Sequence, residues 1–114
     1  MARRKPSLAV VLSPGARREL RDIYAYNVEH RSRTQANKYE DFLLSRIARL
    51  ATEFDDGRQI LGFPDLKSVT LKPSRQGEGH VVIYEIDAAA QSVYIHHPYP
   101  TNMDIQGRLE SEFE

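Results

Sequence analysis

The chain of 114 residues is 40% hydrophobic and 28% charged, a balance typical of a folded globular protein rather than a disordered one. Its 16 Lys and Arg residues balance 16 Asp and Glu residues, and this zero net charge disfavours a protein that grips a long nucleic acid unaided. The sequence contains no cysteine, which excludes disulfides, thiolate metal sites and a cysteine nucleophile and is typical of a reducing compartment.

The first predicted element is a short strand over residues 8–12, Leu-Ala-Val-Val-Leu. That apolar run is too short for a signal-peptide core or a membrane span, so we expect a soluble, cytoplasmic protein. Ser13 and Pro14 then form a strong helix start, with the serine as N-cap and the proline at the first helical position. Apolar residues recur at helical spacing from Ala16 to Tyr24, which predicts a helix over about residues 14–30.

A second helix is predicted over about residues 34–56, with Thr34 as its N-cap. Gly57 is expected to end it in the left-handed conformation. The short link between the two helices predicts an antiparallel helical hairpin. Apolar residues step by three or four positions along the second helix at Ala36, Tyr39, Leu43, Ile47, Leu50 and Phe54.

The second half of the chain predicts a sheet. Residues 58–64 read as a loop around a glycine and a proline, and residues 66–71 as a strand. The run 80–86 is rich in β-branched residues and nearly continuous in its hydrophobicity, which predicts a strand covered on both faces. Residues 93–95 resume the strand pattern after a brief interruption, so the last two strands are expected to form an antiparallel hairpin.

Two prolines follow this hairpin. Pro98 and Pro100 lack the N–H group that a sheet ladder needs, so they are expected to end the last strand and to free the chain beyond it. Residues 102–105 begin a short terminal helix, and the acidic tail over residues 110–114 is expected to fray.

These elements predict one α+β domain over residues 1–114, with its core at about residues 8–109. A small, mostly antiparallel sheet carries the helical hairpin on one face, in the order β-α-α-β-β-β, followed by a short C-terminal helix. The residues expected to be buried between the two layers are Leu20, Ile23, Leu43, Ile47, Leu50, Val82, Tyr84 and Ile95.

Several short motifs occur together in a definite order. Residues 16–26 match the pattern A-x-x-D/E-L-x-x-I-x-x-Y, and the second helix follows A-x-x-Y…L-A-x-x-P-x-x-G with Phe54 in place of the proline. Residues 66–68, Leu-Lys-Ser, are similar to an L-R-S strand entry, and residues 80–84 to an H-x-I-F-Y strand. Met103-Asp104 matches a Met-Asp pair after the last strand. In these motifs the chain resembles toxins of the RelE/ParE superfamily of bacterial type II toxin–antitoxin systems, and it is closer to the ParE-like branch.

The resemblance implies a ParE-like toxin that binds DNA gyrase, blocks replication and inhibits growth without chemistry of its own. It also implies a cognate antitoxin as partner in a hetero-oligomer, with an extended antitoxin segment over exposed apolar surface. ParE-like chains end in a pattern such as I-x-R-I-L-H-x-x-M-D, and here His97 stands at the arginine position and Pro100 at the histidine position. The residues expected to bind the target are His97, Tyr99, Asn102, Met103 and Asp104.

A second reading stays open, because RelE-like members are ribosome-dependent endoribonucleases that cleave mRNA. Whether the chain is an enzyme therefore remains undecided at this point. The candidates for proton transfer and phosphate neutralisation would be His80, His97, Tyr99, Lys72 and Arg75. A third reading is a member that is not toxic and only binds an antitoxin.

The sequence suggests no cofactor and no metal. A metal site formed by His80, His96 and His97 is disfavoured because no second motif supplies further ligands. Tyr24 and Tyr26, like Tyr39, are expected to pack helices rather than stack on bases.

Overall fold

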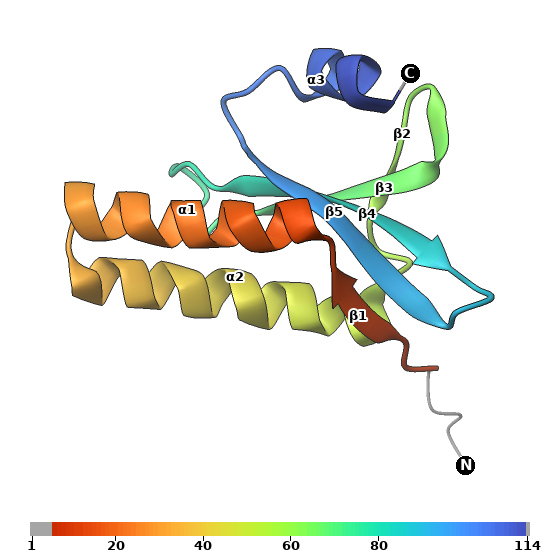
Figure 1. The fold of residues 1–114 in the computed structure, drawn as a ribbon, viewed down its shortest axis with the longest axis horizontal. Coiled ribbons are helices and arrows are strands. Elements are labelled where there is room, and N and C mark those ends of the chain that lie inside the picture. Colours follow the sequence, from red (N-terminus) through yellow and green to blue (C-terminus); the bar gives the residue numbers. More distant parts are fainter. Residues whose placement is uncertain (1–5, 114) are drawn as a thin grey trace.

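The structure, a computed structural model, describes residues 6–113. Two long helices lie on one face of a sheet and a short helix lies on the other (Figure 1). This is the predicted α+β architecture, with one strand more than expected. The elements in chain order are β1 (Ala9–Leu12), α1 (Pro14–His30), α2 (Arg33–Glu53), β2 (Arg58–Ile60), β3 (Phe63–Leu71), β4 (His80–Asp87), β5 (Ser92–Pro100) and α3 (Ile105–Phe113).

The strands of the described residues form one sheet in the order β1-β5-β4-β3-β2. β1 runs parallel to β5, and the other neighbours are antiparallel. The prediction of a loop over residues 58–64 is wrong, because β2 pairs with β3 through Arg58 and Ser68. Gly62 makes the tight turn between them with φ of 83°, a conformation that glycine adopts without strain.

The expectation that two prolines end the last strand is also wrong. β5 pairs with β4 through Pro98 (opposite Val82) and Pro100 (opposite His80). β1 accompanies β5 only as far as Ile95, so beyond that point β5 has no second strand neighbour among residues 6–113. Prolines two residues apart place their missing N–H groups on the same edge, here the open one, so the ladder to β4 survives.

The two long helices start at serines. The Ser13 side chain accepts a hydrogen bond from the Ala16 N–H (2.9 Å) and donates one to the His96 carbonyl (2.7 Å), so the cap also ties α1 to β5. Ser32, not Thr34, caps α2 by accepting from the Gln35 N–H (3.0 Å).

α2 ends earlier than predicted, at Glu53. Gly57 does not adopt the left-handed conformation expected of a cap. Its role is close approach: a Cβ atom there would collide with the Tyr84 hydroxyl and ring. The hydroxyl accepts from the Gly57 N–H (3.0 Å) and donates to the Phe54 carbonyl (2.8 Å), which secures the chain after α2 to the centre of the sheet.

The core has two parts, one on each face of the sheet. Between the helical hairpin and the sheet lie seven of the eight residues predicted as core, and Ile23 is half-buried against them. The second part lies under α3 and consists of Leu66, Ile83, Tyr99 and Leu109. Because Leu109 is fully buried and α3 continues to Phe113, the tail does not fray over residues 110–113, and residue 114 lies outside the described part.

None of the described helices is long and apolar enough to cross a membrane.

Candidate functional site

The residues expected to bind the target lie where β5 ends and the chain passes into α3, a segment we call the β5 rim (residues 97–104). Three of its members have structural roles. Tyr99 is buried in the core under α3, Met103 packs at the edge of that core, and Asp104 accepts a hydrogen bond from the Gly107 N–H at the start of α3 (3.1 Å). Asn102 and Asp104 are exposed and His97 is half-buried, so Asn102 and His97 are the accessible members that do not also support the start of α3.

Tyr99 is held away from solvent. Its hydroxyl donates a short hydrogen bond to Glu112 on α3 (2.5 Å), and its residue surface is 2% exposed. Burial, together with the Glu112 carboxylate, raises the pKa of Tyr99 well above its usual value. The phenol therefore stays protonated near neutral pH and has its proton committed to Glu112.

His97 lies beside Tyr99, with ring centroids 4.4 Å apart. Its Nε2 atom is 3.8 Å from a carboxylate oxygen of Glu19 on α1. The pairing of Ile83 with His97 sets the histidine on the side of the sheet that α3 covers, and its approach to Glu19 shows that the side chain lies at the edge that α1 also reaches.

His80 points to the opposite face, toward the helical hairpin. Its Nδ1 atom lies 2.6 Å from the Tyr39 hydroxyl on α2. Burial raises the pKa of Tyr39 to about 12, so the phenol stays protonated near neutral pH and its O–H can donate a hydrogen bond to Nδ1. Burial, with a smaller contribution from the positive charge of His97, lowers the pKa of His80, and this favours a neutral imidazole.

The two basic candidates, Lys72 and Arg75, follow β3 on the connection to β4, and both are exposed. Neither forms an ion pair within residues 6–113. Lys72 directly follows Leu71, which pairs with His80, so the lysine and that histidine lie at the same end of the sheet. The five candidates for nuclease chemistry are thus near one end of the sheet but divided between its two faces and the exposed connection.

The sequence analysis did not predict the contacts of three candidate side chains: Tyr99 with Glu112, His97 with Glu19, and His80 with Tyr39. Glu112 and Glu19 belong to helices distant in sequence from β5, and no local pattern signals their contacts. Tyr39 was foreseeable, because it recurs at helical spacing on the buried face of α2 and was assigned there to packing.

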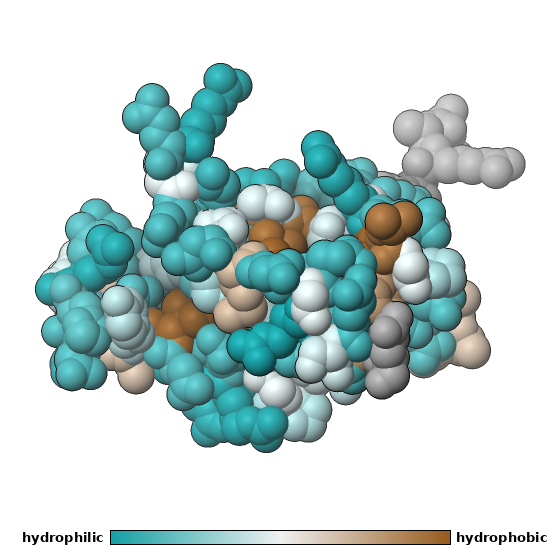
Figure 2. All heavy atoms as spheres, turned by 90° about the horizontal axis from the view of Figure 1, so that it is seen from above, coloured by the Kyte–Doolittle hydropathy of each residue, from teal (hydrophilic) through white to brown (hydrophobic). Residues whose placement is uncertain are grey.

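No cluster of three or more potential metal ligands occurs among residues 6–113. Figure 2 shows the molecule from above relative to Figure 1. This face is mostly hydrophilic, and its hydrophobic residues lie in separate patches. Two open cavities lie beside α3, one of about 220 Å³ next to Phe63 and Phe113 and one of about 300 Å³ next to Ile60 and Ile105.

Comparison with solved structures finds the same fold in bacterial toxins. A chain of the chromosomal ParDE TA system from P. aeruginosa superposes with a TM-score of 0.67 at 14% identity, covering 82% of this chain and 95% of that one. The E. coli toxin RelE, as an arginine mutant in the free state, gives a TM-score of 0.62 at 11% identity, covering 93% of this chain and 96% of RelE. At such low identities the likeness shows the fold alone. No curated protein sequence matches the chain.

The family comparison is more specific. The model of the ParE toxin of type II toxin–antitoxin systems (parDE) matches residues 10–97, which run from β1 to the first residue of the β5 rim. This match covers most of the chain and bears out the resemblance read from the motifs. The chain therefore belongs to the ParE toxin family of type II toxin–antitoxin systems.

Proposed function

We propose that the chain inhibits DNA gyrase, and with it replication and growth, by binding rather than by a chemical reaction, as its resemblance to ParE-like toxins implies. The observation that carries this proposal is the burial of Tyr99, whose hydroxyl is committed to Glu112 beneath α3. A nuclease needs its proton-transfer groups within reach of the scissile phosphate. Because α3 covers Tyr99 and its hydroxyl is hydrogen-bonded to Glu112, this phenol cannot reach a phosphate while α3 stays in place.

The position of His80 supports the same proposal. Its imidazole faces the helical hairpin and is hydrogen-bonded to the Tyr39 hydroxyl, whereas His97 and Tyr99 lie on the other face of the sheet. One scissile phosphate would have to reach both faces to use all three groups. A contact surface needs no such convergence, and the β5 rim offers His97 and Asn102 to a partner at the end of the sheet.

A RelE-like ribosome-dependent endoribonuclease is the second candidate. The 4.4 Å contact between His97 and Tyr99 favours it, because a histidine beside a phenol can act with it as an acid–base pair. In that case the ribosome and mRNA replace gyrase as partners, and Lys72 and Arg75 would neutralise the phosphate.

Tyr99→Phe separates the two candidates, because it removes the hydroxyl and keeps the ring in the core. A nuclease that uses this hydroxyl loses about 10²–10⁴-fold in rate. If the chain acts by binding gyrase, the purified Tyr99→Phe variant should still inhibit supercoiling by gyrase in an assay without ribosomes. Tyr94→Phe is the matched control, since the Tyr94 hydroxyl makes no hydrogen bond within residues 6–113. Codon-dependent mRNA cleavage on ribosomes, with no effect on supercoiling, would overturn the proposal.

We also infer that a cognate antitoxin binds the chain in the cytoplasm. The outer edge of β1 carries no strand neighbour in the described residues, and Val11 on it is 41% exposed. An extended, disordered antitoxin segment is suited to such an edge, because it supplies backbone hydrogen bonds as it orders. Co-expression with the neighbouring gene product should relieve the growth defect and yield a stable complex. Absence of both a growth defect and a complex would contradict the toxin–antitoxin reading.

A further inference from the structure

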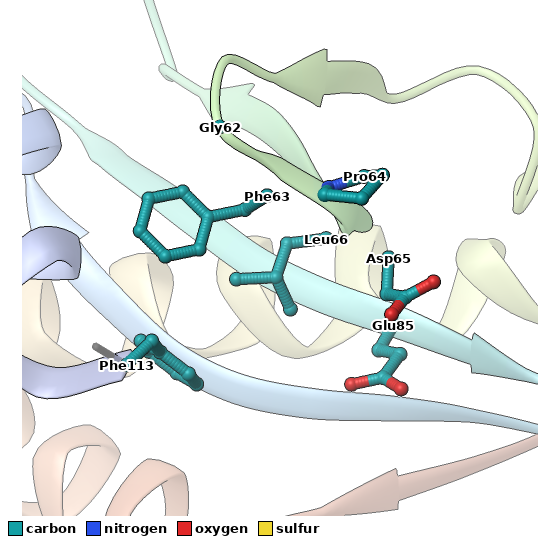
Figure 3. A pocket seen from close by; sticks show the side chains of 7 residues that line it. All are labelled: Gly62, Phe63, Pro64, Asp65, Leu66, Glu85 and Phe113. Atoms are coloured by element: carbon teal, nitrogen blue, oxygen red, sulfur yellow. The ribbon is translucent and has the colours of Figure 1, made fainter.

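The cavity of about 220 Å³ lies between the β2–β3 turn and the C-terminal end of α3, and we call it the β3–α3 pocket (Figure 3). A cavity of about 10–15 Å³ already holds one water molecule, so this one has room for a side chain. Its lining residues are Gly62, Phe63, Pro64, Asp65, Leu66, Glu85 and Phe113.

The pocket has an apolar part and an acidic part. In Figure 3 the Phe63 and Phe113 rings and the Leu66 side chain occupy one side, while the Asp65 and Glu85 carboxylates lie at the other end. Phe113 is fixed by edge-on contacts, with its ring centroid 6.3 Å from that of Phe63 and 5.3 Å from that of His96. The aromatic walls therefore belong to the folded structure even though Phe113 is 40% exposed.

The two carboxylates lack a strong cation. Asp65 is exposed and forms no ion pair or hydrogen bond through its side chain within residues 6–113. Glu85 has one oxygen 3.0 Å from Nε2 of His96, and its side chain remains 40% exposed. None of the described Lys and Arg side chains pairs with either carboxylate. Two like charges at the acidic end of one cavity repel each other, so a cation placed between them is favoured.

We propose that the β3–α3 pocket receives an arginine side chain of a protein partner, with its guanidinium between Asp65 and Glu85 and its aliphatic part against Phe63, Leu66 and Phe113. Arginine fits better than lysine because its planar fork can pair with carboxylates and stack on aromatic rings at the same time. Its long stem also buries apolar surface while the charged head stays at the mouth. The inference rests on the proposed function, because a toxin that acts by binding has protein partners that could contribute the arginine.

The pocket can be tested without any partner. We expect Nα-acetyl-argininamide, titrated into the purified full-length chain, to bind with a Kd of about 1–10 mM, the range of one weak contact. The backbone amide NMR signals of Phe63, Asp65, Leu66 and Glu85 should shift saturably. The uncharged isostere Nα-acetyl-citrullinamide should bind at least about tenfold more weakly, because it lacks the positive charge.

Two variants locate the binding. The isosteric pair Asp65→Asn with Glu85→Gln should weaken the arginine probe at least about tenfold, whereas Glu78→Gln, an exposed carboxylate on the β3–β4 connection, should leave it unchanged. Asp65→Asn alone is the second variant, since Asp65 is a surface residue whose change leaves the Glu85 contact to His96 intact. Equal shifts with the citrulline probe, or binding that survives the double substitution, would overturn the proposal.

The identity of the occupant is tested next, in the complex with the cognate antitoxin. Alanine replacement of one antitoxin arginine should weaken the complex about tenfold, and this loss should disappear when the toxin carries both pocket substitutions, as a double-mutant cycle requires. Additive losses for every antitoxin arginine would overturn this assignment. Self-association of the purified chain that the pocket substitutions abolish would assign the pocket to a second copy instead, which also overturns it. Probe binding does not depend on gyrase, and supercoiling inhibition does not depend on the probe, so the two proposals fail separately.

Discussion

Replacing Tyr84 by phenylalanine tests how the sheet holds the end of the helical hairpin. Tyr84 is fully buried, and its hydroxyl both accepts from the Gly57 N–H (3.0 Å) and donates to the Phe54 carbonyl (2.8 Å). The substitution keeps the ring and removes both bonds. Each bond contributes about 0.5–1.5 kcal/mol net, and a partly buried N–H that loses its acceptor adds a desolvation cost of about 1 kcal/mol or more. We therefore expect the free energy of unfolding to fall by about 2–3 kcal/mol.

The assay is urea unfolding followed by far-UV circular dichroism. A loss of this size is a large part of the free energy of unfolding of a small domain, ~5–15 kcal/mol. In a thermal melt followed by the same signal, it should lower Tm by about 8–15 °C. The slope of the transition should not change, because the surface exposed on unfolding is nearly the same. Tyr94→Phe serves as the control, since that hydroxyl makes no hydrogen bond within residues 6–113, and should cost less than ~0.5 kcal/mol. If Tyr84→Phe is as mild as this control, the hydroxyl does not secure the chain after α2.

Two further predictions concern the start of α1 and the response to acid. Ser13→Ala removes the N-cap of α1 and the bond to the His96 carbonyl together, so it should cost about 1–3 kcal/mol in urea unfolding, while Ser7→Ala, an exposed position before β1, should have no effect. Because the pKa of His80 is lowered in the folded chain, the folded state binds that proton more weakly than the unfolded state, whose histidine has a pKa near ~6.5. The stability conferred by neutral His80 is thus present above about pH 6.5 and is lost as the pH falls through the lowered pKa of the folded state. His80→Gln should therefore flatten the decline of the urea midpoint below about pH 6.5. An unchanged decline would contradict the assignment.

The helical hairpin and the central strand were predictable because their signals are local. Ser13-Pro14 marks a helix start by its own chemistry, and the apolar spacing along α2 places Leu43, Ile47 and Leu50 on one face whatever lies opposite. The run of β-branched residues in β4 likewise predicts a strand between two layers, and both layers are present.

The missed features depend on neighbours that are distant in the sequence. The segment of β2 contains no strong strand signal, and it becomes a strand through its pairing with β3. The prolines of β5 are tolerated only because β1 ends at Leu12 and leaves one edge of β5 open. Likewise, the acidic tail is helical to Phe113 because Leu109 reaches the core and Glu112 meets Tyr99.

The candidate site shows why a list of rim residues was only partly informative. Sequence position alone could not separate residues that support the end of the sheet from residues that a partner can touch. Tyr99 and Met103 fill the core under α3, and Asp104 begins that helix. Truncating any of these three would weaken α3 together with any contact that the rim makes, so a loss of toxicity would not identify its cause.

His97 and Asn102 are the rim residues on which a binding role can be tested cleanly. Asn102 is exposed, and the His97 side chain is 28% exposed, with a long 3.8 Å approach to Glu19 and a ring contact to Tyr99. An ion pair at this long distance contributes little to stability, with a typical range of ~0–1 kcal/mol. If the β5 rim contacts gyrase, His97→Ala should reduce inhibition of supercoiling by about 5–30-fold, the effect of a ~1–2 kcal/mol contact. The free energy of unfolding measured in urea should stay within about 1 kcal/mol of the parent, the size of one aromatic contact. A chain that keeps full inhibition after both His97→Ala and Asn102→Ala would place the gyrase contact elsewhere on the molecule.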